Sequence, residues 1–162
     1  MVVENQVISS TEIRGKISDG RVEEAITKLG HPYLIASRRI SGLQKGTKLG
    51  YPTLNFAGPS SNKVLPPPGI FAAELEYGKN AWKGALYFGN CPTFGNRETH
   101  LEFHVFDFIG DEPAEGEKAN LWLHSMIRPD IAFPGAAELT DAIQKDIITI
   151  KNFFSQEKEQ CR

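Results

Sequence analysis

Five short segments between residues 33 and 127 have the residue pattern of β-strands, and no helical segment separates them. Parallel strands need a crossover connection, usually a helix, so this order excludes a sheet of βαβ units and favours an antiparallel barrel or sandwich. Apolar and polar side chains alternate most strictly from 99 to 108, which predicts a strand with one buried face. The five segments are 33–40, 70–77, 81–88, 99–108 and 118–127, with a hairpin turn at 78–80.

Helical patterns flank the strand region on both sides. At the front, Ser9 and Glu12 have capping-box spacing, and Asp19 is placed to cap a second helix that ends at Gly30. At the back, an apolar stripe at helical spacing from 139 to 154 predicts a long helix, followed by a polar tail. The pattern therefore predicts a mainly β fold: a compact antiparallel β-barrel with a C-terminal helix packed across it and short N-terminal helices.

Composition narrows the class of protein. The chain has 162 residues, 40% of them hydrophobic, and a formal net charge of −2, which indicates a globular domain and excludes a disordered chain. It lacks the positive charge of a general nucleic-acid binder, and no apolar run approaches the roughly 20 residues of a membrane span. The first five residues carry no secretory signal, and Cys91 and Cys161 are too few for a disulfide framework or a zinc cluster. We expect a soluble, cytoplasmic protein without nucleic-acid or membrane partners.

The connection from 42 to 69 is long for a small domain, and ordered loops of this length are usually functional. Gly42, Gly46 and Gly50 recur in it at four-residue intervals. Glycine lets backbone N–H groups approach an anion closely, and Lys45 and Lys48 add positive charge. The spacing is not that of a P-loop. The alternative is a glycine-bearing surface hairpin that binds no ligand.

Thr53 and Asn55 follow the glycine loop directly. Residues i and i+2 of an extended segment point the same way, so a hydroxyl and an amide oxygen converge on one side. Pro52 stiffens the chain just before them. Neutral oxygens of this kind suit Mg²⁺, which keeps much of its coordination shell for phosphates and water. The alternative is a turn in which both side chains bond their own backbone.

Glu102 is the candidate general base. It lies on the same strand face as His104 and two phenylalanines, and a carboxylate on a partly apolar face suits proton abstraction. The alternative is a glutamate on an edge strand that faces solvent. His100 also shares this face, but no second ligand cluster accompanies the three residues, so a zinc site is disfavoured. We expect His104 and His124 to complete hydrogen bonds inside or beside the barrel.

Several segments resemble, in order and spacing, the signature segments of the riboflavin kinase family. The most specific contain Pro-Thr-x-Asn at 52–55 and Leu-Glu-x-His at 101–104. The resemblance covers roughly residues 31–154. Its segments are 46–55, 92–94, 101–108, 127–129 with Phe133, and 139–146.

The front end resembles a different domain. Residues 8–14, Ile-Ser-Ser-Thr-Glu-Ile-Arg, are similar to the Ser-Ser-Thr-x-Ile-Arg motif that closes the adenylyltransferase domain of the bacterial bifunctional enzyme. This implies a helical remnant of that domain at 1–30 and a riboflavin kinase barrel with its C-terminal helix at 31–162. We therefore expect no FMN adenylylation by this chain, and we expect it to be part of, or derived from, a longer bifunctional enzyme.

The family resemblance implies transfer of the ATP γ-phosphoryl group to the ribityl 5′-hydroxyl of riboflavin, giving FMN and ADP, on a Greek-key β-barrel. Glu102 matches the catalytic base of the family, and Thr53 and Asn55 match the residues that hold Mg²⁺ against the phosphates. Arg128 and Phe133 match the part that closes over the flavin. The residues implied to bind ATP and its phosphates are Gly42, Lys45, Gly46, Lys48, Gly50 and Pro52.

Several positions depart from the family pattern. Tyr87 stands where Asn is common, Cys91 where Arg is common, and Thr47 where a basic residue is frequent. Residues 111–116 replace a stretch that usually reads Asp-Leu-Tyr-Gly, and 134–136 replace the usual serine at the helix start. We interpret these changes as altered affinity for nucleotide or flavin. The alternatives are a weakened or non-catalytic flavin- or nucleotide-binding module and a nucleic-acid-binding barrel, with which the net charge of −2 conflicts.

Overall fold

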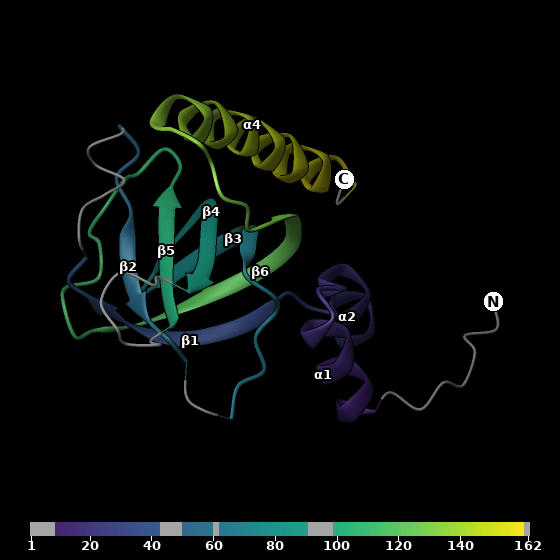
Figure 1. Cartoon of the computed structure of the whole chain (residues 1–162). Helices are drawn as coiled ribbons and strands as arrows, with labels where there is room; N and C mark the ends of the chain where they lie inside the picture. The colour runs from purple at the N-terminus through teal and green to yellow at the C-terminus, as the bar shows by residue number, and fades with distance from the viewer. Residues whose placement is uncertain (1–8, 43–49, 60–61, 91–98, 161–162) are drawn as a thin grey trace.

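Six antiparallel strands close into a barrel in the computed structural model, which describes residues 9–42, 50–59, 62–90 and 99–160. Around the barrel the strands lie in the order β1, β2, β5, β4, β3, β6, and helix α4 lies on a different side from helices α1 and α2 (Figure 1). The elements are α1 (Ser10–Ser18), α2 (Val22–Leu29), β1 (Tyr33–Ile40), β2 (Leu54–Ala57), β3 (Gly69–Tyr77), β4 (Asn80–Asn90), β5 (Thr99–Val105), β6 (Lys118–Pro129) and α4 (Ala136–Gln160).

The strand order is that of a Greek key. β3, β4 and β5 follow one another as neighbours, and the long connection from β2 to β3 leaves β2 beside β5. β1 pairs with both β2 and β6, which closes the barrel. The predicted mainly β, antiparallel Greek-key barrel with a C-terminal helix and short N-terminal helices is confirmed.

The barrel interior is filled by the apolar side chains that alternation predicts to face inward. In β5, Leu101 and Phe103 are fully buried, whereas Glu102 between them is half-buried on the outer face. Each large apolar side chain buried in this way stabilises the fold by roughly 1.5–3 kcal/mol. The largest fully buried side chains are Phe56, Phe71, Phe103, Ile17, Ile35, Leu75, Leu86, Leu101, Leu121, Leu123, Ile150 and Val22.

Two strands differ from the prediction by more than two residues at an end. β2 lies inside the segment predicted to be a loop, so the prediction of five strands is wrong; its four residues are too few to show clear alternation. β5 ends at Val105 rather than at 108. There the Phe106 N–H donates to the Lys83 carbonyl at 2.9 Å, and the positive φ of Asp107, +49°, turns the chain out of the strand.

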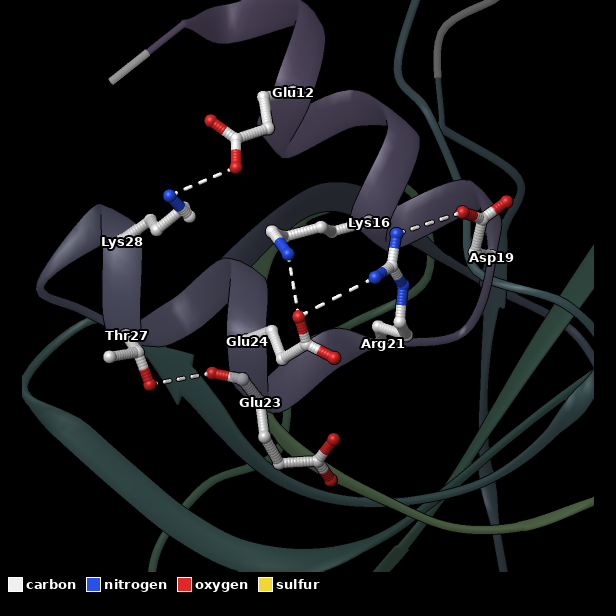
Figure 2. A network of polar contacts seen from close by, with 8 residues as sticks. All are labelled: Glu12, Lys16, Asp19, Arg21, Glu23, Glu24, Thr27 and Lys28. Carbon is white, nitrogen blue, oxygen red and sulfur yellow. Dashed lines mark hydrogen bonds and ion pairs between the residues drawn. The ribbon is translucent and has the colours of Figure 1, made fainter. Parts of the chain in front are cut away.

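The start of α1 has the predicted Ser9 cap, but with the bond of a simple N-cap in place of that of a capping box. The Ser9 hydroxyl accepts a hydrogen bond from the Thr11 N–H at 3.2 Å. Glu12 forms an ion pair across to Lys28 of α2 at 2.9 Å (Figure 2). The carboxylate therefore joins the two helices.

The prediction that Asp19 caps the second helix is wrong. Asp19 ends α1 instead, where its backbone N–H donates to the carbonyls of Gly15 and Ile17. Its carboxylate accepts from the Arg21 guanidinium at 3.2 Å, and α2 begins after Arg21 without a side-chain cap (Figure 2). Gly30, with a left-handed φ of +76°, ends α2 as predicted.

Helices α1 and α2 pack on the barrel through apolar side chains. Ile17, Val22 and Ala25 are fully buried and belong to the same core cluster as the barrel interior. α2 contacts β1 and β6. The two short helices therefore share the core of the barrel.

Helix α4 packs across β3, β4 and β6, as predicted. Its buried Ile150 and Phe154 form a second apolar cluster with Ala72 of β3 and Phe106. Small side chains on the strands let a helix approach a sheet closely. The helix begins at Ala136 and continues to Gln160, beyond the point where a polar tail was predicted.

Candidate active site

An outward-facing row of side chains crosses five neighbouring strands of the barrel. Asn55 on β2 pairs with Glu102 on β5, and Glu102 pairs with Tyr87 on β4. Tyr87 pairs in turn with Ile70 on β3, and Ile70 pairs with Arg128 on β6. Side chains of cross-strand partners lie close enough to interact. The row therefore brings together predicted site residues from three distant segments of the chain.

Glu102, Thr53 and Asn55 form one polar cluster at the β2 end of the row. The Thr53 hydroxyl donates to Oε2 of Glu102 at 3.5 Å, and the Asn55 amide donates to the Thr53 carbonyl at 3.5 Å. The bond from Asn55 to the Thr53 carbonyl is of the kind expected for a turn that bonds its own backbone. The bond from Thr53 to Glu102 joins a predicted metal ligand to the predicted base. Gly42 lies against the cluster: a Cβ there would come within 1.9 Å of Nδ2 of Asn55, so a larger residue would displace the Asn55 side chain.

Glu102 does not lie on an edge strand. β5 pairs with β2 on one side and with β4 on the other. The alternative of a solvent-facing edge-strand glutamate is therefore wrong. The half-buried carboxylate lies on the outer surface of the barrel, where a substrate hydroxyl can reach it from outside.

His104 and His124 complete hydrogen bonds, as predicted. Nδ1 of His104 lies 2.9 Å from the Pro52 carbonyl oxygen, and Nδ1 of His124 lies 3.4 Å from Oε1 of Glu157. Among the side chains that the structure describes, no three His, Cys, Asp or Glu residues gather into a metal-binding group; the side chain of His100 lies outside them. His104 thus holds Pro52, which immediately precedes the two predicted metal ligands.

The glycine loop is described at its two ends. Lys45, Gly46 and Lys48 lie outside the described residues. At one end Gly42 packs against the polar cluster, and at the other Gly50 has a φ of +83°, which residues with side chains rarely adopt. Gly50 is therefore favoured by the backbone conformation, and Gly42 by the space that the Asn55 side chain occupies.

Arg128 ends the row on the β6 side, and Phe133 lies beside it. The Arg128 guanidinium donates to both carboxylate oxygens of Asp146, at 2.9 and 3.1 Å from Nε and at 2.8 Å from Nη2. It also lies over the Phe133 ring, 5.5 Å from the centroid. Asp146 belongs to α4 and is only 7% exposed, so this bidentate pair fixes the guanidinium.

Two of the departures from the family pattern make hydrogen bonds beside the site. The Tyr87 hydroxyl donates to Oδ2 of Asp130 at 3.0 Å. Within 111–116, Glu115 accepts a hydrogen bond from the hydroxyl of Ser41, which directly precedes the glycine loop, at 2.6 Å. Residues 134 and 135 lead into α4, which begins at 136. The departures at Thr47 and Cys91, and the segment 92–94, lie outside the described residues.

The sequence patterns missed the residues that hold the site together. Asp146 interrupts an apolar helical stripe, and a carboxylate in such a place signals a partner across the interface. Asp130 gives no local signal, because its partner Tyr87 lies 43 residues away.

A separate hollow of about 240 Å³ lies beside the C-terminal half of α4. Two of its lysines lie over aromatic rings: Nζ of Lys83 is 4.4 Å from the Phe154 centroid, and Nζ of Lys151 is 5.3 Å from that of Phe106. None of the predicted site residues lines it, so the hollow is distinct from the row. Its lining residues are Lys83, Phe106, Asp107, Lys151, Phe154 and Ser155.

The family whose model matches the chain is described as riboflavin kinase, and the match covers residues 29–154. The chain is similar to bifunctional riboflavin kinase/FMN adenylyltransferases from Bacillus subtilis, with 32% identity over 94% of this chain and 48% of the relative, and from Escherichia coli K12, with 32% identity over 93% and 47%. A relative with the same description from Haemophilus influenzae is 32% identical over 93% and 48%. The chain therefore spans about half the length of the curated relatives it matches.

A solved structure shares the fold. It is a crystal structure described as a macrolide-efflux protein from Streptococcus pneumoniae, with a TM-score of 0.77, 30% sequence identity, and coverage of 89% of this chain and 46% of that one. This likeness supports the barrel and its helices. Among the helices that the structure describes, none is long and apolar enough to cross a membrane.

Proposed function

The chain belongs to the riboflavin kinase family, and from this premise we propose that it transfers the γ-phosphoryl group of ATP to the 5′-hydroxyl of riboflavin, giving FMN and ADP. The observation that carries the proposal is the outward row, which joins Glu102 and its polar cluster to Arg128 on one surface of the barrel. A substrate with a hydroxyl at one end and a large ring system at the other suits such a row.

In the proposed reaction Glu102 acts as the general base. Its carboxylate accepts the proton of the riboflavin 5′-hydroxyl as the hydroxyl oxygen forms a bond to the γ-phosphorus. The bond from that phosphorus to the oxygen it shares with the β-phosphate breaks, and ADP leaves. Thr53 contacts Oε2 of Glu102 and orients the carboxylate. The transfer needs positioning and charge neutralisation, and no covalent intermediate with the protein.

We propose that Thr53 and Asn55 hold Mg²⁺. The hydroxyl of Thr53, the amide oxygen of Asn55 and the adjacent carboxylate of Glu102 are hard oxygen donors on one surface, which fits this ion. When bound with ATP, the ion neutralises charge that develops on the phosphates. The Asn55 amide group donates through Nδ2 to the Thr53 carbonyl, and this leaves Oδ1 as the donor atom that faces a cation.

The remaining predicted residues have roles in binding. We propose that the glycine loop and Pro52 bind ATP and its phosphates, with Gly42 letting the backbone approach the polar cluster. Arg128 and Phe133 are proposed to bind the flavin ring system. The bidentate bond from Arg128 to Asp146 supports this role, since it holds the guanidinium and the Phe133 ring beside each other.

The test is product analysis with purified chain, riboflavin and MgATP, together with calorimetric titration of riboflavin. We expect FMN from the wild type and a kcat lower by roughly 10²–10⁴-fold in Glu102→Gln, with riboflavin affinity retained. Glu74→Gln is a matched control, because Glu74 is another half-buried glutamate on the barrel, on β3. Its activity should equal that of the wild type.

Two outcomes contradict the proposal. A wild type that forms no FMN at high enzyme concentration with Mg²⁺ or Mn²⁺ overturns the activity, and tight binding of FMN without turnover identifies a binding module instead. A Glu102→Gln variant that turns over normally leaves the activity but removes Glu102 as its base.

We propose that residues 1–30 correspond to the end of an adenylyltransferase region and that the chain is part of, or derived from, a longer bifunctional enzyme. The family match begins at residue 29, whereas the relative from Bacillus subtilis aligns with 94% of the chain, which supports this division. Adenylyl transfer is not proposed for these residues. We place the proposed reaction in the cytoplasm, where ATP is abundant.

A further inference from the structure

The residue that departs from the family pattern at position 87 joins two parts of the site. Tyr87 lies in the outward row between Glu102 on β5 and Ile70 on β3. Its hydroxyl donates to Oδ2 of Asp130 at 3.0 Å, and Asp130 directly follows β6. This bond connects β4, which pairs with the strand of Glu102, to the segment that contains Phe133.

Gly89 gives the Tyr87 ring this position. Residues i and i+2 of a strand face the same side, so Tyr87 and Gly89 share the outer face of β4. A Cβ on residue 89 would lie 2.1 Å from the Tyr87 hydroxyl oxygen and 2.4 Å from Cζ. The ring therefore lies over the glycine backbone, and the two residues together direct the hydroxyl toward Asp130.

The segment 129–135 is held where it leaves β6. The Asp130 N–H donates to the Pro68 carbonyl at 3.0 Å, and Nη1 of Arg128 donates to the Pro129 carbonyl at 3.1 Å. These two bonds come from residues beside the end of β6. The Tyr87 hydroxyl reaches the segment from β4, two strands away around the barrel, and so fixes its direction across the outer face.

A substrate that reaches both Glu102 and Arg128 has to cross Tyr87. Three interstrand spacings separate Glu102 from Arg128 along the row, which is about 14 Å of barrel surface. Tyr87 and Ile70 occupy the two positions between them. Ile70 packs partly against the α4 cluster, so the Tyr87 ring is the apolar surface that a planar ligand meets on this row.

We propose that Tyr87 is a positioning residue for the flavin: its ring lies under the substrate between the base and Arg128, and its hydroxyl holds the segment 129–135 against the barrel. The inference rests on the proposed function for the identity of the substrate. It assigns Tyr87 to flavin affinity and not to phosphoryl transfer.

The test compares Tyr87→Phe, Asp130→Ala and the double variant in kinetics with riboflavin and MgATP. We expect Tyr87→Phe to raise the riboflavin KM about fivefold, because it loses a hydrogen bond to a carboxylate, and to leave kcat and the ATP KM within about twofold. Asp130→Ala should give a similar rise, and the double variant no larger one, because the two side chains share a single bond. Tyr77→Phe is a matched control, since the Tyr77 hydroxyl bonds Glu117 elsewhere on the barrel.

A riboflavin KM in Tyr87→Phe equal to that of the wild type overturns the inference. A double variant in which the effects of Tyr87→Phe and Asp130→Ala on this KM add also overturns it. Hydrogen–deuterium exchange without substrate tests the role of Tyr87 independently of the proposed function. Faster exchange of the 130–133 amides in Tyr87→Phe supports the contact even where the wild type makes no FMN. Unchanged exchange of these amides overturns the role of Tyr87 in holding the segment.

Discussion

The N-terminal helices and helix α4 are both packed on the barrel, yet they are attached in different ways (Figure 1). α1 and α2 bury Ile17, Val22 and Ala25 in the barrel core, and most of their charged side chains pair with one another (Figure 2). α4 buries an apolar stripe too, but it also sends the carboxylate of Asp146 to Arg128 of β6. Helices α1 and α2 therefore support the fold, whereas α4 supports the fold and also contacts a residue of the candidate site.

Strand β6 is contacted by both helical units. Its pairing with β3 shifts register twice, and Glu23 of α2 accepts bonds from the Ser125 hydroxyl at 2.5 Å and the Met126 N–H at 2.9 Å between the two shifts. The second shift lets Ile127 and Arg128, although consecutive, both face α4. Each helical unit therefore contacts the part of β6 that leads to Arg128, but from α4 the contact is made by a nearly buried charge.

Among the changes that test this comparison, removing the carboxylate of Asp146 should have the largest effect. Asp146→Ala leaves Arg128 without its partner, and we expect a loss of about 3 kcal/mol in the free energy of unfolding. The guanidinium also loses its orientation, so the riboflavin KM should rise roughly tenfold or more. Denaturant unfolding and steady-state kinetics measure the two effects.

Asp141→Ala is the control for this change, because Asp141 is an exposed carboxylate on the same helix. It should alter neither quantity. If Asp146→Ala keeps the wild-type riboflavin KM, α4 acts only through apolar packing, and the contrast between the two helical units disappears.

Truncation of Ile17 should affect stability alone. Ile17→Ala removes three carbon atoms from a fully buried position, and we expect a loss of about 2–4 kcal/mol in the free energy of unfolding. The KM and kcat of the folded protein should match the wild type, since among the described elements α1 packs mainly on α2, away from the outward row. Ile148→Ala, at a position on α4 that is 60% exposed, should change stability by less than about 0.5 kcal/mol. A changed riboflavin KM in Ile17→Ala would show that the N-terminal helices also act on the site.

The elements of the fold that the sequence predicts well are those with one buried face and sufficient length. β1 has its predicted bounds, and the long helix appears where the apolar stripe places it. β2 escaped prediction because four residues between proline and glycine carry little periodicity. Asp19 was assigned to the wrong helix because a cap depends on where the chain turns, and the turn is set by the packing of α1 on α2.

The sequence predicts which residues belong to the candidate site, but not which of them lie side by side on the barrel. Thr53 and Asn55 are close in sequence, and their shared direction follows from strand geometry. The register that places Asn55 opposite Glu102 depends on the closure of the whole barrel. The same holds for Arg128 and Asp146, which are 18 residues apart on a strand and a helix that have to be docked before they meet.

The smallest effect concerns the charges between α1 and α2. The hydrogen bond from Lys28 is the main cause that holds the pKa of Glu12 below its ordinary value of 4.5, and a bond from Lys16 does the same for Glu24. A carboxylate whose pKa is lower in the folded protein stabilises the fold above its unfolded pKa, and this contribution is lost as the pH falls through the folded pKa. We therefore expect the Tm of the wild type to fall more steeply from about pH 6 to pH 3 than that of Glu12→Gln/Glu24→Gln.

Measurements at added salt test whether the difference between the two Tm curves comes from ion pairs. The carboxylates of Glu12 and Glu24 are exposed, so added salt screens them and should bring the two Tm curves together. The Arg128–Asp146 pair is shielded from solvent by α4, so the effect of Asp146→Ala should persist at the same salt concentration. Curves that are already parallel at low salt would mean that the ion pairs between α1 and α2 add nothing to stability, and the contrast with the nearly buried Arg128–Asp146 pair would then be larger.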